Sequence, residues 1–447
     1  MADNSRKAAL PPLRIALAGL GTVGTGVIRL LEANGAMVAA RAGRDMRIVA
    51  VSARERSRDR GIDLSRYDWH DDMTEMPARE DVDAVVELVG GSDGPALTLA
   101  RRTLGAGKSL VTANKAMVAH HGLDLAELAA QNGAALKFEA AVAGGIPVVK
   151  GLREGAAANA IEQIYGILNG TSNFILSAME DTGADFDEML ASAQERGFAE
   201  ADPTFDIEGV DAAHKLAILA AIAFGCRIDF ASVETQGISR VRAADIRQAA
   251  TLGFAIRLIG MADTEEQEGM TKLLQRVRPC LVPKDHPLAA VDGPTNAVVT
   301  EGNFSGRLLF QGAGAGDGPT ASAVVADLID LARGEAGGET SAPFSVPVAD
   351  LKAMPPADPS GRKGRTYLRF TVYDRPGVLA EITAAMRDAE VSIESLIQEG
   401  RSDDGSEVLV AMVTHEGPEG CVTKAIELLA DAEGLTAPPL VMPILQA

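Results

Sequence analysis

Short apolar runs alternate with longer helix-like stretches in the first part of the chain. A Gly-rich turn and a helical pattern that ends near residue 33 follow the first apolar run. Strands and helices that alternate in this order build a parallel sheet with crossover helices. The pattern therefore predicts an α/β domain with strands at residues 13–18, 46–51, 84–88 and 109–112.

The hydrophobic pattern becomes mixed from about residue 135 onward. Short strand-like pieces at 136–140 and 164–168 occur with Ala-rich helical stretches near 211–225 and 243–250, which predicts a second domain of the α+β class. Residues 333–364 concentrate Gly, Pro and Ser and show little apolar periodicity, so we predict a linker there.

The tail of the chain predicts a third, smaller domain. Strand, helix, two strands, helix and a final strand follow one another at 365–373, 377–389, 391–398, 407–414, 419–432 and 440–444. This βαββαβ order is that of a ferredoxin-like domain.

Length and composition limit the class of protein. At roughly 100–200 residues per domain, 447 residues predict two to four domains. The chain has 42 Lys and Arg against 62 Asp and Glu, and a net charge of −20 repels the phosphate backbone of nucleic acids. A hydrophobic fraction of 47% with 23% charged residues excludes disorder throughout. We expect a multi-domain globular protein that does not bind nucleic acid.

The cysteines and the N-terminal segment bear on the compartment. Cys226, Cys280 and Cys421 lie far apart without a CxxC or Cys/His spacing, so neither a disulfide framework nor a structural zinc site is indicated. The N-terminal segment lacks the apolar core of a signal peptide, and no apolar run approaches the roughly 18 residues of a membrane span. We therefore expect a soluble, cytoplasmic protein without a membrane span.

A G-x-G-x-x-G motif follows the first predicted strand and opens the first predicted helix. Gly19 would permit the tight turn, Gly21 would let the backbone approach a pyrophosphate, and Gly24 would let helix and strand pack closely. The phosphates of a dinucleotide would then lie at the helix N-terminus. A plain Gly-rich turn between strand and helix is the alternative explanation.

The end of the second strand bears on the choice of coenzyme. NAD-specific sites usually have Asp or Glu there, which binds the ribose 2′-hydroxyl. Here the strand runs into Ser-Ala-Arg54, and a guanidinium suits a 2′-phosphate. More arginines follow, so a solvated basic loop is the alternative. We expect NADP in preference to NAD, with use of both coenzymes left open.

Two later segments lie at the carboxyl ends of predicted strands, where open α/β sheets bind ligands. One is 87–92, with Ser92 as a candidate coenzyme contact, and the other is 112–115, which ends at Lys115. Lys115 could contact the nicotinamide ribose or the substrate, but a strand-end lysine in solvent is an equally simple explanation.

Acidic residues crowd the segment 197–211, just ahead of a helical stretch. Asp211 and Lys215 are four residues apart, which places them on one face of that helix, as in an exposed i,i+4 ion pair. The helix continues as an almost wholly apolar run, so we expect its start to be buried or to face a cleft. A lysine held there beside a carboxylate can act as general acid/base between an alcohol and a carbonyl. His214 is interpreted as a packing or surface neighbour.

The loop 139–147 consists of small residues with one carboxylate, that of Glu139. Backbone carbonyls together with one carboxylate can ligate a hard cation. A simple turn between a strand and a helix explains the same residues without any ligand.

Taken in order, these segments resemble the homoserine dehydrogenase family in its longer bacterial form, which carries a C-terminal ACT regulatory domain. The resemblance covers nearly the whole chain apart from the linker. Its most specific motifs are GLGTVG at 19–24, TANKA at 112–116, NGTSNFIL at 169–176, GFAEADPTFDIEGVDAAHK at 197–215 and GAGAGDGPTASAV at 312–324.

The resemblance implies the reversible interconversion of L-homoserine and L-aspartate 4-semialdehyde with NAD(P), on the route to threonine and methionine. In the reductive direction a lysine ammonium would donate a proton to the developing alkoxide. Lys215 matches the proton donor and acceptor of the family, and Lys115 matches a lysine that contacts cofactor and substrate and is the alternative acid/base. Glu200 and Asp211 match the carboxylates that bind the substrate.

The resemblance also implies positions for the coenzyme and a cation. Gly21, Thr22 and Val23 match the pyrophosphate loop, and Gly197 and Gly316 match positions that line the nicotinamide site. A monovalent cation, usually sodium, would be ligated largely through main-chain oxygens, at Glu139, Val142, Gly144 and Ile146.

Residues 372–386, VYDRPGVLAEITAAM, resemble the beginning of an ACT domain. The implied effector is L-threonine, a feedback inhibitor that binds between paired ACT domains, whereas a purely structural dimerisation module is the alternative. Its carboxylate would meet backbone N–H groups at a helix N-terminus, near Asp374, Gly377, Val378 and Leu379.

We therefore predict an α/β plus α+β protein that forms homodimers or homotetramers. Two rival functions are a non-catalytic amino-acid sensor and a dehydrogenase for a related hydroxy amino acid. The predicted parts are a Rossmann-type nucleotide-binding domain at 1–135 to which 308–333 returns, a substrate-binding and dimerisation domain at 136–307, a linker at 334–364 and a ferredoxin-like ACT domain at 365–447.

Overall fold

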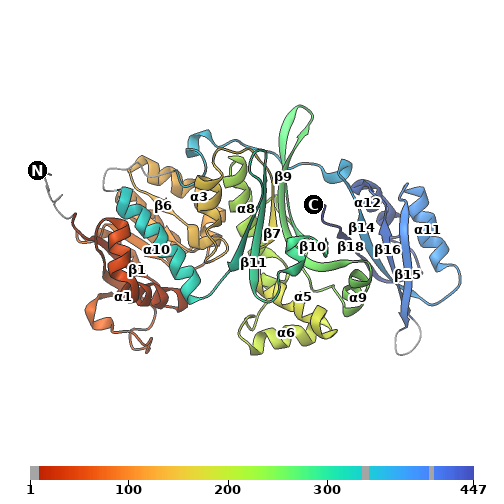
Figure 1. Ribbon diagram of the computed structural model, residues 1–447, viewed down its shortest axis with the longest axis horizontal. Helices are drawn as coiled ribbons and strands as arrows, with labels where there is room; N and C mark the ends of the chain where they lie inside the picture. The colour runs from red at the N-terminus through yellow and green to blue at the C-terminus, as the bar shows by residue number, and fades with distance from the viewer. Residues whose placement is uncertain (1–9, 335–341, 402–406, 447) are drawn as a thin grey trace, which may run out of the picture. The chain divides into compact units, whose positions relative to one another are not determined.

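The computed structural model describes residues 10–334, 342–401 and 407–446 (Figure 1). The chain forms two compact units, each assembled from segments that are distant in the sequence. The first unit lies within Met1–Ile164, His214–Ser232 and Ala297–Met354, and the second lies within Tyr165–Ala213, Val233–Asn296 and Pro355–Ala447.

The first unit contains a six-stranded parallel sheet in the order β3-β2-β1-β4-β5-β6. This is the parallel sheet that the alternation of strands and helices predicts. The middle strands are buried on both faces because helices cover the sheet, and their sequences are accordingly rich in Val, Ile, Leu and Ala. The strands are β1 (Leu13–Ala18), β2 (Met46–Ser52), β3 (Asp68–His70), β4 (Ala84–Glu87), β5 (Ser109–Thr112) and β6 (Leu136–Lys137).

Four helices of the first unit pack on this sheet and on each other. Helix α1 packs with α10, and α2 packs with α3. Helix α10 comes late in the chain, yet its Leu328 and Leu331 belong to the same apolar core as Leu13 and Ile15 of β1. The helices are α1 (Thr22–Ala42), α2 (Pro95–Gly105), α3 (Lys115–Gln131) and α10 (Asp317–Gly334).

Helix α1 is longer than the sequence predicts. The expectation of an end near residue 33 is wrong, because α1 passes through Gly35 and ends only at Gly43, whose φ of +79° forms a left-handed C-cap. A glycine inside a helix costs roughly 1 kcal/mol. Burial of Val38 and Ala42 in the core of the unit stabilises the last turns against this cost.

A second six-stranded sheet has the order β12-β11-β7-β9-β10-β8. Its long hairpin pairs β9 and β10 in antiparallel register over their whole length. The expected strand at 136–140 is shorter than predicted, because a 3-10 turn at Glu139–Ala141 follows β6. The strands are β7 (Ile161–Ile167), β8 (Glu234–Thr235), β9 (Phe254–Gln267), β10 (Met270–Pro283), β11 (Thr295–Gly302) and β12 (Gly306–Ala313).

The helices of the middle part of the chain include the apolar one that the sequence analysis singled out. That helix is α8, in which every side chain from Ala212 to Ile222 is buried. The helices are α4 (Val148–Lys150), α5 (Gly170–Thr182), α6 (Phe186–Glu195), α7 (Thr204–Ile207), α8 (Val210–Phe224) and α9 (Ala243–Thr251).

The described part of the predicted linker, residues 342–364, packs against its surroundings. Phe344 is fully buried with its ring centroid 5.4 Å from that of Phe138. Lys352 forms a parallel bridge opposite Cys226 in the first unit: its carbonyl oxygen accepts from Arg227 N at 2.9 Å, and its N–H donates to the carbonyl oxygen of Gly225 at 3.1 Å. The buried apolar residues of this segment are few and lie among Gly, Pro and Ser, so the sequence alone does not predict their packing; they are Phe344, Val348, Leu351 and Ala357.

The C-terminal domain has the predicted βαββαβ order and an antiparallel sheet in the order β15-β16-β14-β18. Leu368, Phe370 and Val372 of β14 face the apolar core that α11 and α12 share. Tyr367, Arg369 and Thr371, which alternate with them, are buried as well, although they are polar or amphipathic. The elements are β14 (Thr366–Tyr373), α11 (Val378–Asp388), β15 (Ile393–Arg401), β16 (Glu407–Thr414), α12 (Glu419–Leu428) and β18 (Leu435–Pro443), with a short pair of β13 (Lys363–Gly364) and β17 (Gly417–Pro418).

The fold class that the sequence predicts is therefore confirmed: a Rossmann-like parallel sheet, a mixed sheet domain and a ferredoxin-like C-terminal domain. Among the described residues, no helix is long and apolar enough to cross a membrane.

Candidate active site

The Gly-rich turn between β1 and α1 is shaped by close backbone contacts. Gly19 has φ +99°, and a Cβ there would lie 2.5 Å from the carbonyl oxygen of Leu88. A Cβ on Gly24 would lie 1.9 Å from the carbonyl oxygen of Gly19. Gly21, the N-cap of α1, is exposed, and a Cβ there would meet no atom within 4 Å. The turn therefore has open space at a helix N-terminus, where the aligned N–H groups favour an anion.

The basic loop after β2 lies against this turn. Gly19 N donates a hydrogen bond to the carbonyl oxygen of Ser52 at 2.9 Å, which joins the end of β2 to the turn. The Arg60 guanidinium donates to the carbonyl oxygens of Leu20 at 3.1 Å and Glu55 at 2.6 Å, so it fixes the loop. Arg54 is exposed in the bend directly after β2. Arg60 is therefore engaged in holding the loop, whereas the side chain of Arg54 is exposed.

Glu87 organises the loops at the ends of β4 and β5. Its fully buried carboxylate accepts hydrogen bonds from Val89 N at 2.7 Å and Thr112 Oγ1 at 2.6 Å. Asn114 then donates to the carbonyl oxygen of Gly91 at 2.7 Å and caps α3 by accepting from Met117 N.

Two predicted coenzyme contacts lie on these loops. Lys115 is half-buried at the first position of α3, so the loops at the ends of β4 and β5 position its backbone. Ser92 donates to Asp93 at 2.6 Å on the loop after β4. The sequence analysis did not assign roles to Glu87 and Asn114. The sequence features that could have identified them are a carboxylate at the end of an apolar strand, for Glu87, and an Asn at a helix N-cap after the next strand, for Asn114.

The 139–147 loop and the 312–316 turn lie side by side in the first unit. Gly145 N donates to the carbonyl oxygen of Ala313 at 3.1 Å, and a Cβ on Gly144 would lie 2.5 Å from Gly314. Immediately after Gly316, the carbonyl oxygen of Asp317 would lie 2.8 Å from a Cβ on Gly26 of α1. The structure thus brings together three segments that are far apart in the sequence, including the predicted cation ligands Val142, Gly144 and Ile146.

Glu139 is a buried acid in this region. Its carboxylate accepts hydrogen bonds from Val149 N at 3.1 Å and Lys150 N at 2.8 Å, and its own N–H donates to Asp327 at 2.8 Å. Burial raises the pKa of Glu139 to about 7, and the nearby Asp327 carboxylate acts in the same direction. Lys150 forms an ion pair with Asp330 at 2.6 Å. A buried carboxylate of this kind gains stability from any cation placed beside it.

The NGTSN segment at the start of α5 holds one of the predicted substrate carboxylates. Asn169 Nδ2 donates hydrogen bonds to Asp211 at 2.8 Å and to Asp206 at 2.8 Å. Asn169 Oδ1 accepts from Ser172 N at 2.7 Å, so the same side chain caps α5. Ser172 Oγ donates to the carbonyl oxygen of Asp206. The sequence analysis quoted this motif but did not assign Asn169 a role, and its signal is an Asn at an N-cap position.

Glu200 lies in the loop between α6 and α7, and its side chain is exposed. Gln194 donates to the carbonyl oxygen of Glu200 at 3.1 Å, and Thr171 donates to that of Phe198 at 2.6 Å. Gly197, with φ +75°, begins this loop. The loop is therefore fixed to α5 and α6 through its backbone, while the Glu200 carboxylate faces outward.

Helix α8 carries Asp211 and Lys215 one turn apart, on one face of the helix. Asp211 is 2% exposed and Lys215 is 7% exposed, so neither is a solvated surface charge. His214 stacks on Phe230 with 4.2 Å between ring centroids, and its Nε2 lies 3.2 Å from Nε2 of His120. Packing contacts of this kind fit the interpretation of His214 as a structural neighbour.

The turn before α11 has the form expected for a carboxylate site. Gly377, with φ +100°, is the N-cap of α11, and no side chain caps this helix end. Asp374 and Leu379 are exposed, but Val378 is buried in the domain core. Because its side chain is buried, Val378 can contact a ligand only through its backbone.

A metal centre built from side chains is not present in the described residues, where no three His, Cys, Asp or Glu side chains group together.

Comparison with known proteins adds three matches along the chain. Residues 147–329 match the family described as "Homoserine dehydrogenase", and residues 19–139 match "Homoserine dehydrogenase, NAD binding domain". Residues 366–428 match the ACT domain.

Individual relatives agree with these matches. A homoserine dehydrogenase of Pseudomonas aeruginosa is 41% identical over 431 residues, which are 96% of this chain and 98% of that protein. The crystal structure of a homoserine dehydrogenase from Thiobacillus denitrificans has a TM-score of 0.88 and 40% identity, covering 98% of this chain and 99% of the other. A hyperthermophilic archaeal homoserine dehydrogenase in complex with NADPH has a TM-score of 0.61 and 25% identity, covering 72% of this chain and 97% of the other.

Proposed function

The chain belongs to the homoserine dehydrogenase family, and from that premise we propose how its residues carry out the reaction. The enzyme is an NAD(P)-dependent oxidoreductase with a C-terminal ACT domain. The proposed reaction is the interconversion of L-homoserine and L-aspartate 4-semialdehyde in the biosynthesis of threonine and methionine. The rival functions of a non-catalytic sensor and of a dehydrogenase for another hydroxy amino acid lose support from these relatives.

The observation that carries the proposal is that Asp211 and Lys215 lie one turn apart on α8 and are both buried. Asp211 is held by Asn169, so its carboxylate is fixed before substrate arrives. A fixed carboxylate suits the substrate ammonium, and Glu200, whose side chain is exposed, completes the binding of the amino acid. Lys215 then gives its proton to the alkoxide during reduction and takes it back during oxidation. Lys115 remains the alternative acid/base.

The coenzyme fits the turn between β1 and α1. Gly19, Gly21 and Gly24 with the N–H groups of Thr22 and Val23 would hold the pyrophosphate, because the space at Gly21 is open. The bound nicotinamide supplies the hydride in reduction and accepts it in oxidation. Ser92, Lys115, Gly197 and Gly316 are the proposed contacts nearer the nicotinamide.

Arg54 supports a preference for NADP over NAD. Its exposed guanidinium lies directly after β2, where a 2′-phosphate would extend, and Arg60 is already engaged with backbone carbonyls. The NADPH complex of the archaeal relative is consistent with this preference.

We propose a monovalent cation, sodium being the first candidate, at Glu139, Val142, Gly144 and Ile146. The raised pKa of the buried Glu139 supports the proposal, because a cation would offset the cost of its negative charge. The loop lies against the 312–316 turn, so a cation there would stabilise the backbone near the coenzyme turn.

We propose L-threonine as the feedback effector at the N-terminus of α11. The uncapped helix end at Gly377 supports the proposal, because its N–H groups favour a carboxylate. Asp374 would then bind the effector's ammonium group, and a structural dimerisation role for the domain is the alternative. Paired ACT domains require a homodimer or homotetramer.

The domain boundaries predicted from the sequence are proposed here as functional parts. Packing of α10 against α1 supports the return of residues 308–333 to the nucleotide-binding domain. We also propose a cytoplasmic location, which the free cysteines Cys226, Cys280 and Cys421 support because a reducing compartment leaves thiols unpaired.

The direct test is reduction of NADP⁺ and, separately, NAD⁺ by the purified protein with L-homoserine, followed by the absorbance of the reduced coenzyme. We expect homoserine-dependent turnover, faster with NADP⁺, and inhibition by millimolar L-threonine that disappears when the chain is truncated near Gly364. Absence of turnover in protein that binds NADPH would return the sensor function to first place.

A further inference from the structure

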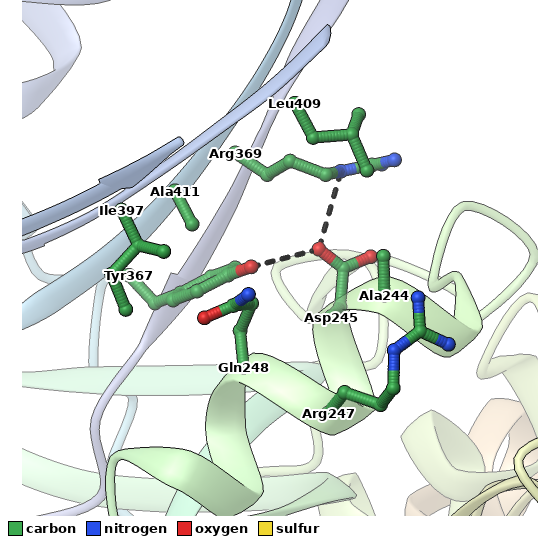
Figure 2. Close-up of a pocket in the computed structure, with 9 residues that line it drawn as sticks. All are labelled: Ala244, Asp245, Arg247, Gln248, Tyr367, Arg369, Ile397, Leu409 and Ala411. Atoms are coloured by element: carbon green, nitrogen blue, oxygen red, sulfur yellow. Dashed lines mark hydrogen bonds and ion pairs between the residues drawn. The ribbon is translucent and has the colours of Figure 1, made fainter. Parts of the chain in front are cut away.

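A small cavity lies between helix α9 and the ACT sheet, within the second unit (Figure 2). Its volume is about 80 Å³. By the same measure a single water needs roughly 10–15 Å³, so the cavity has room for a ligand of several heavy atoms. Its lining comes from α9 and from three strands of the ACT sheet, namely Ala244, Asp245, Arg247 and Gln248 with Tyr367, Arg369, Ile397, Leu409 and Ala411.

Buried charges line the cavity. Asp245 is fully buried and accepts a hydrogen bond from Tyr367 Oη at 2.9 Å, while Arg369 Nε lies 3.2 Å from the same carboxylate oxygen. The other Asp245 oxygen accepts from Arg242 N at 2.9 Å at the start of α9. Asp245 therefore uses both oxygens within the protein, and it also explains why the polar face of β14 is buried.

Arg369 keeps donor capacity that these contacts do not use. It is 5% exposed, and its Nη2 donates to the carbonyl oxygen of Arg240 at 2.9 Å. Its Nη1 is buried and has no hydrogen-bond partner among the described residues. A buried guanidinium N–H without a partner is costly, and a carboxylate is the partner that best satisfies it.

The charge at the cavity favours an anion. Arg247 lines it from α9 with an exposed side chain, so two arginines face one carboxylate in the lining. Ile397, Leu409 and Ala411 supply an apolar wall for a short aliphatic chain. We propose that this cavity is a second ligand site of the enzyme, which takes a small aliphatic carboxylate of the size of an α-amino acid, with the carboxylate on Arg369 and Arg247.

This site is separate from the effector turn proposed at Asp374–Leu379. Asp374 and the turn that follows it do not line the cavity, and Val378 packs into the domain core on the helix side of the sheet. Tyr367 and Arg369 belong to the opposite face of β14, since alternate residues of a strand point to opposite faces.

A ligand in the cavity can affect the proposed substrate carboxylates through a chain of contacts. This consequence rests on the proposed function. A ligand carboxylate would compete with Asp245 for Arg369, and Asp245 caps the start of α9. The first residue of α9, Ala243, donates its N–H to Asp185 at 2.9 Å, directly ahead of α6. Helix α9 also packs on α5, whose capping residue Asn169 holds Asp211. We expect ligand in the cavity to change the KM for homoserine more than kcat.

The test uses full-length protein that carries Asp374→Ala, so that the proposed effector turn does not contribute, with L-threonine and propionate titrated separately by calorimetry. Ala244→Leu fills the mouth of the cavity and leaves the Asp245–Arg369 pair intact, while Ala250→Leu makes the same change on α9 at a half-buried position outside the cavity. We expect Ala244→Leu and Arg247→Ala each to weaken binding at least about tenfold, the loss expected for one charge-assisted contact or for blocked access. Ala250→Leu and Arg387→Ala, an exposed arginine of α11, should bind as the unaltered protein does.

Two further readouts locate the ligand. Hydrogen exchange in 243–251 and 366–373 should slow on binding, and Asp374→Ala should leave this effect unchanged. Binding of propionate alone as well as threonine would show that the carboxylate suffices, whereas binding of threonine alone would show that the ammonium is also recognised; both results support the site. Binding that Ala244→Leu leaves intact would overturn it, as would the absence of binding by both probes in the Asp374→Ala protein. Homoserine turnover measured without effector tests the proposed function independently of the cavity. Ala244→Leu should leave this turnover unchanged.

Discussion

Asn169 and Asp211 are joined by a hydrogen bond of 2.8 Å, although they lie on different helices. Asn169 caps α5 with its amide oxygen and orients Asp211 with its amide nitrogen. The position of the proposed substrate carboxylate therefore depends on a residue that carries no charge. Lys215 follows Asp211 by one turn of α8.

Replacing Asn169 by Ala should raise the KM for homoserine. The change removes the hydrogen bonds to Asp211 and Asp206 together with the cap of α5. Loss of the bond to Asp211 is expected to raise KM about tenfold, with a smaller effect on kcat. NADPH affinity should stay unchanged. Steady-state kinetics and NADPH titration check this, with the exposed Asn132→Ala as control. Equal losses of homoserine and NADPH affinity would point instead to general disruption of the fold.

Replacing Arg54 by Ala should reduce the preference for NADP. Loss of a charge-assisted contact to the 2′-phosphate should lower kcat/KM with NADP by about tenfold or more and leave the value with NAD nearly unchanged. The matched control is Arg58→Ala, an exposed arginine of the same loop. If both variants change NADP use equally, the loop acts through its total charge and Arg54 has no special part.

The ion pair of Arg14 and Asp83 should make the nucleotide-binding unit sensitive to acid. Burial alone would raise the pKa of Asp83, but hydrogen bonds from the Arg14 side chain and backbone outweigh burial and hold it below its ordinary 3.8. The folded state thus binds the proton more weakly than the unfolded state does. The stabilisation is present above pH 3.8 and is lost as the pH falls through the lowered pKa.

Asp83→Asn should lower the melting temperature near neutral pH by about 2–4 °C, for a loss of roughly 1 kcal/mol. Calorimetry at several pH values should show that the difference in melting temperature between the variant and the unaltered protein becomes smaller as the solution is acidified. The exposed Asp431→Asn should show no such difference at any pH. A difference of constant size down to the lowest pH would mean that packing, and not charge, stabilises this position.

The sequence predicted most of the fold because its signals are local. The turn at 19–24 and the apolar strands on either side identify the first domain, and the βαββαβ order identifies the last. The end of α1 was not predicted, because packing of Val38 and Ala42 decides it. The packing of the predicted linker was not predicted for a similar reason, because tertiary contacts bury Phe344, Val348 and Leu351 within a segment rich in Gly, Pro and Ser.

The same distinction between local and long-range signals applies to the residues of the candidate site. Residues proposed to act through their own chemistry, such as Lys215 and Arg54, could be named from motif and spacing. Residues that act by holding others, such as Asn169 and Glu87, could not, because their partners are 42 and 25 residues away in the sequence. The buried Asp245–Arg369 pair belongs to this second group, since nothing in the alternation of β14 distinguishes a polar residue in solvent from one under a helix.

The most direct test of the account is the kinetics of Lys215→Ala beside Lys115→Ala, with homoserine and NADP⁺ at saturation. The account predicts that Lys215→Ala lowers kcat by about 10²–10⁴-fold, the usual worth of a positioned acid/base, while NADPH binds with unchanged affinity. Lys115→Ala should instead weaken coenzyme or substrate binding with a smaller loss of kcat. Near-normal kcat in Lys215→Ala, with a large loss in Lys115→Ala, would contradict the assignment and move the proton transfer to Lys115.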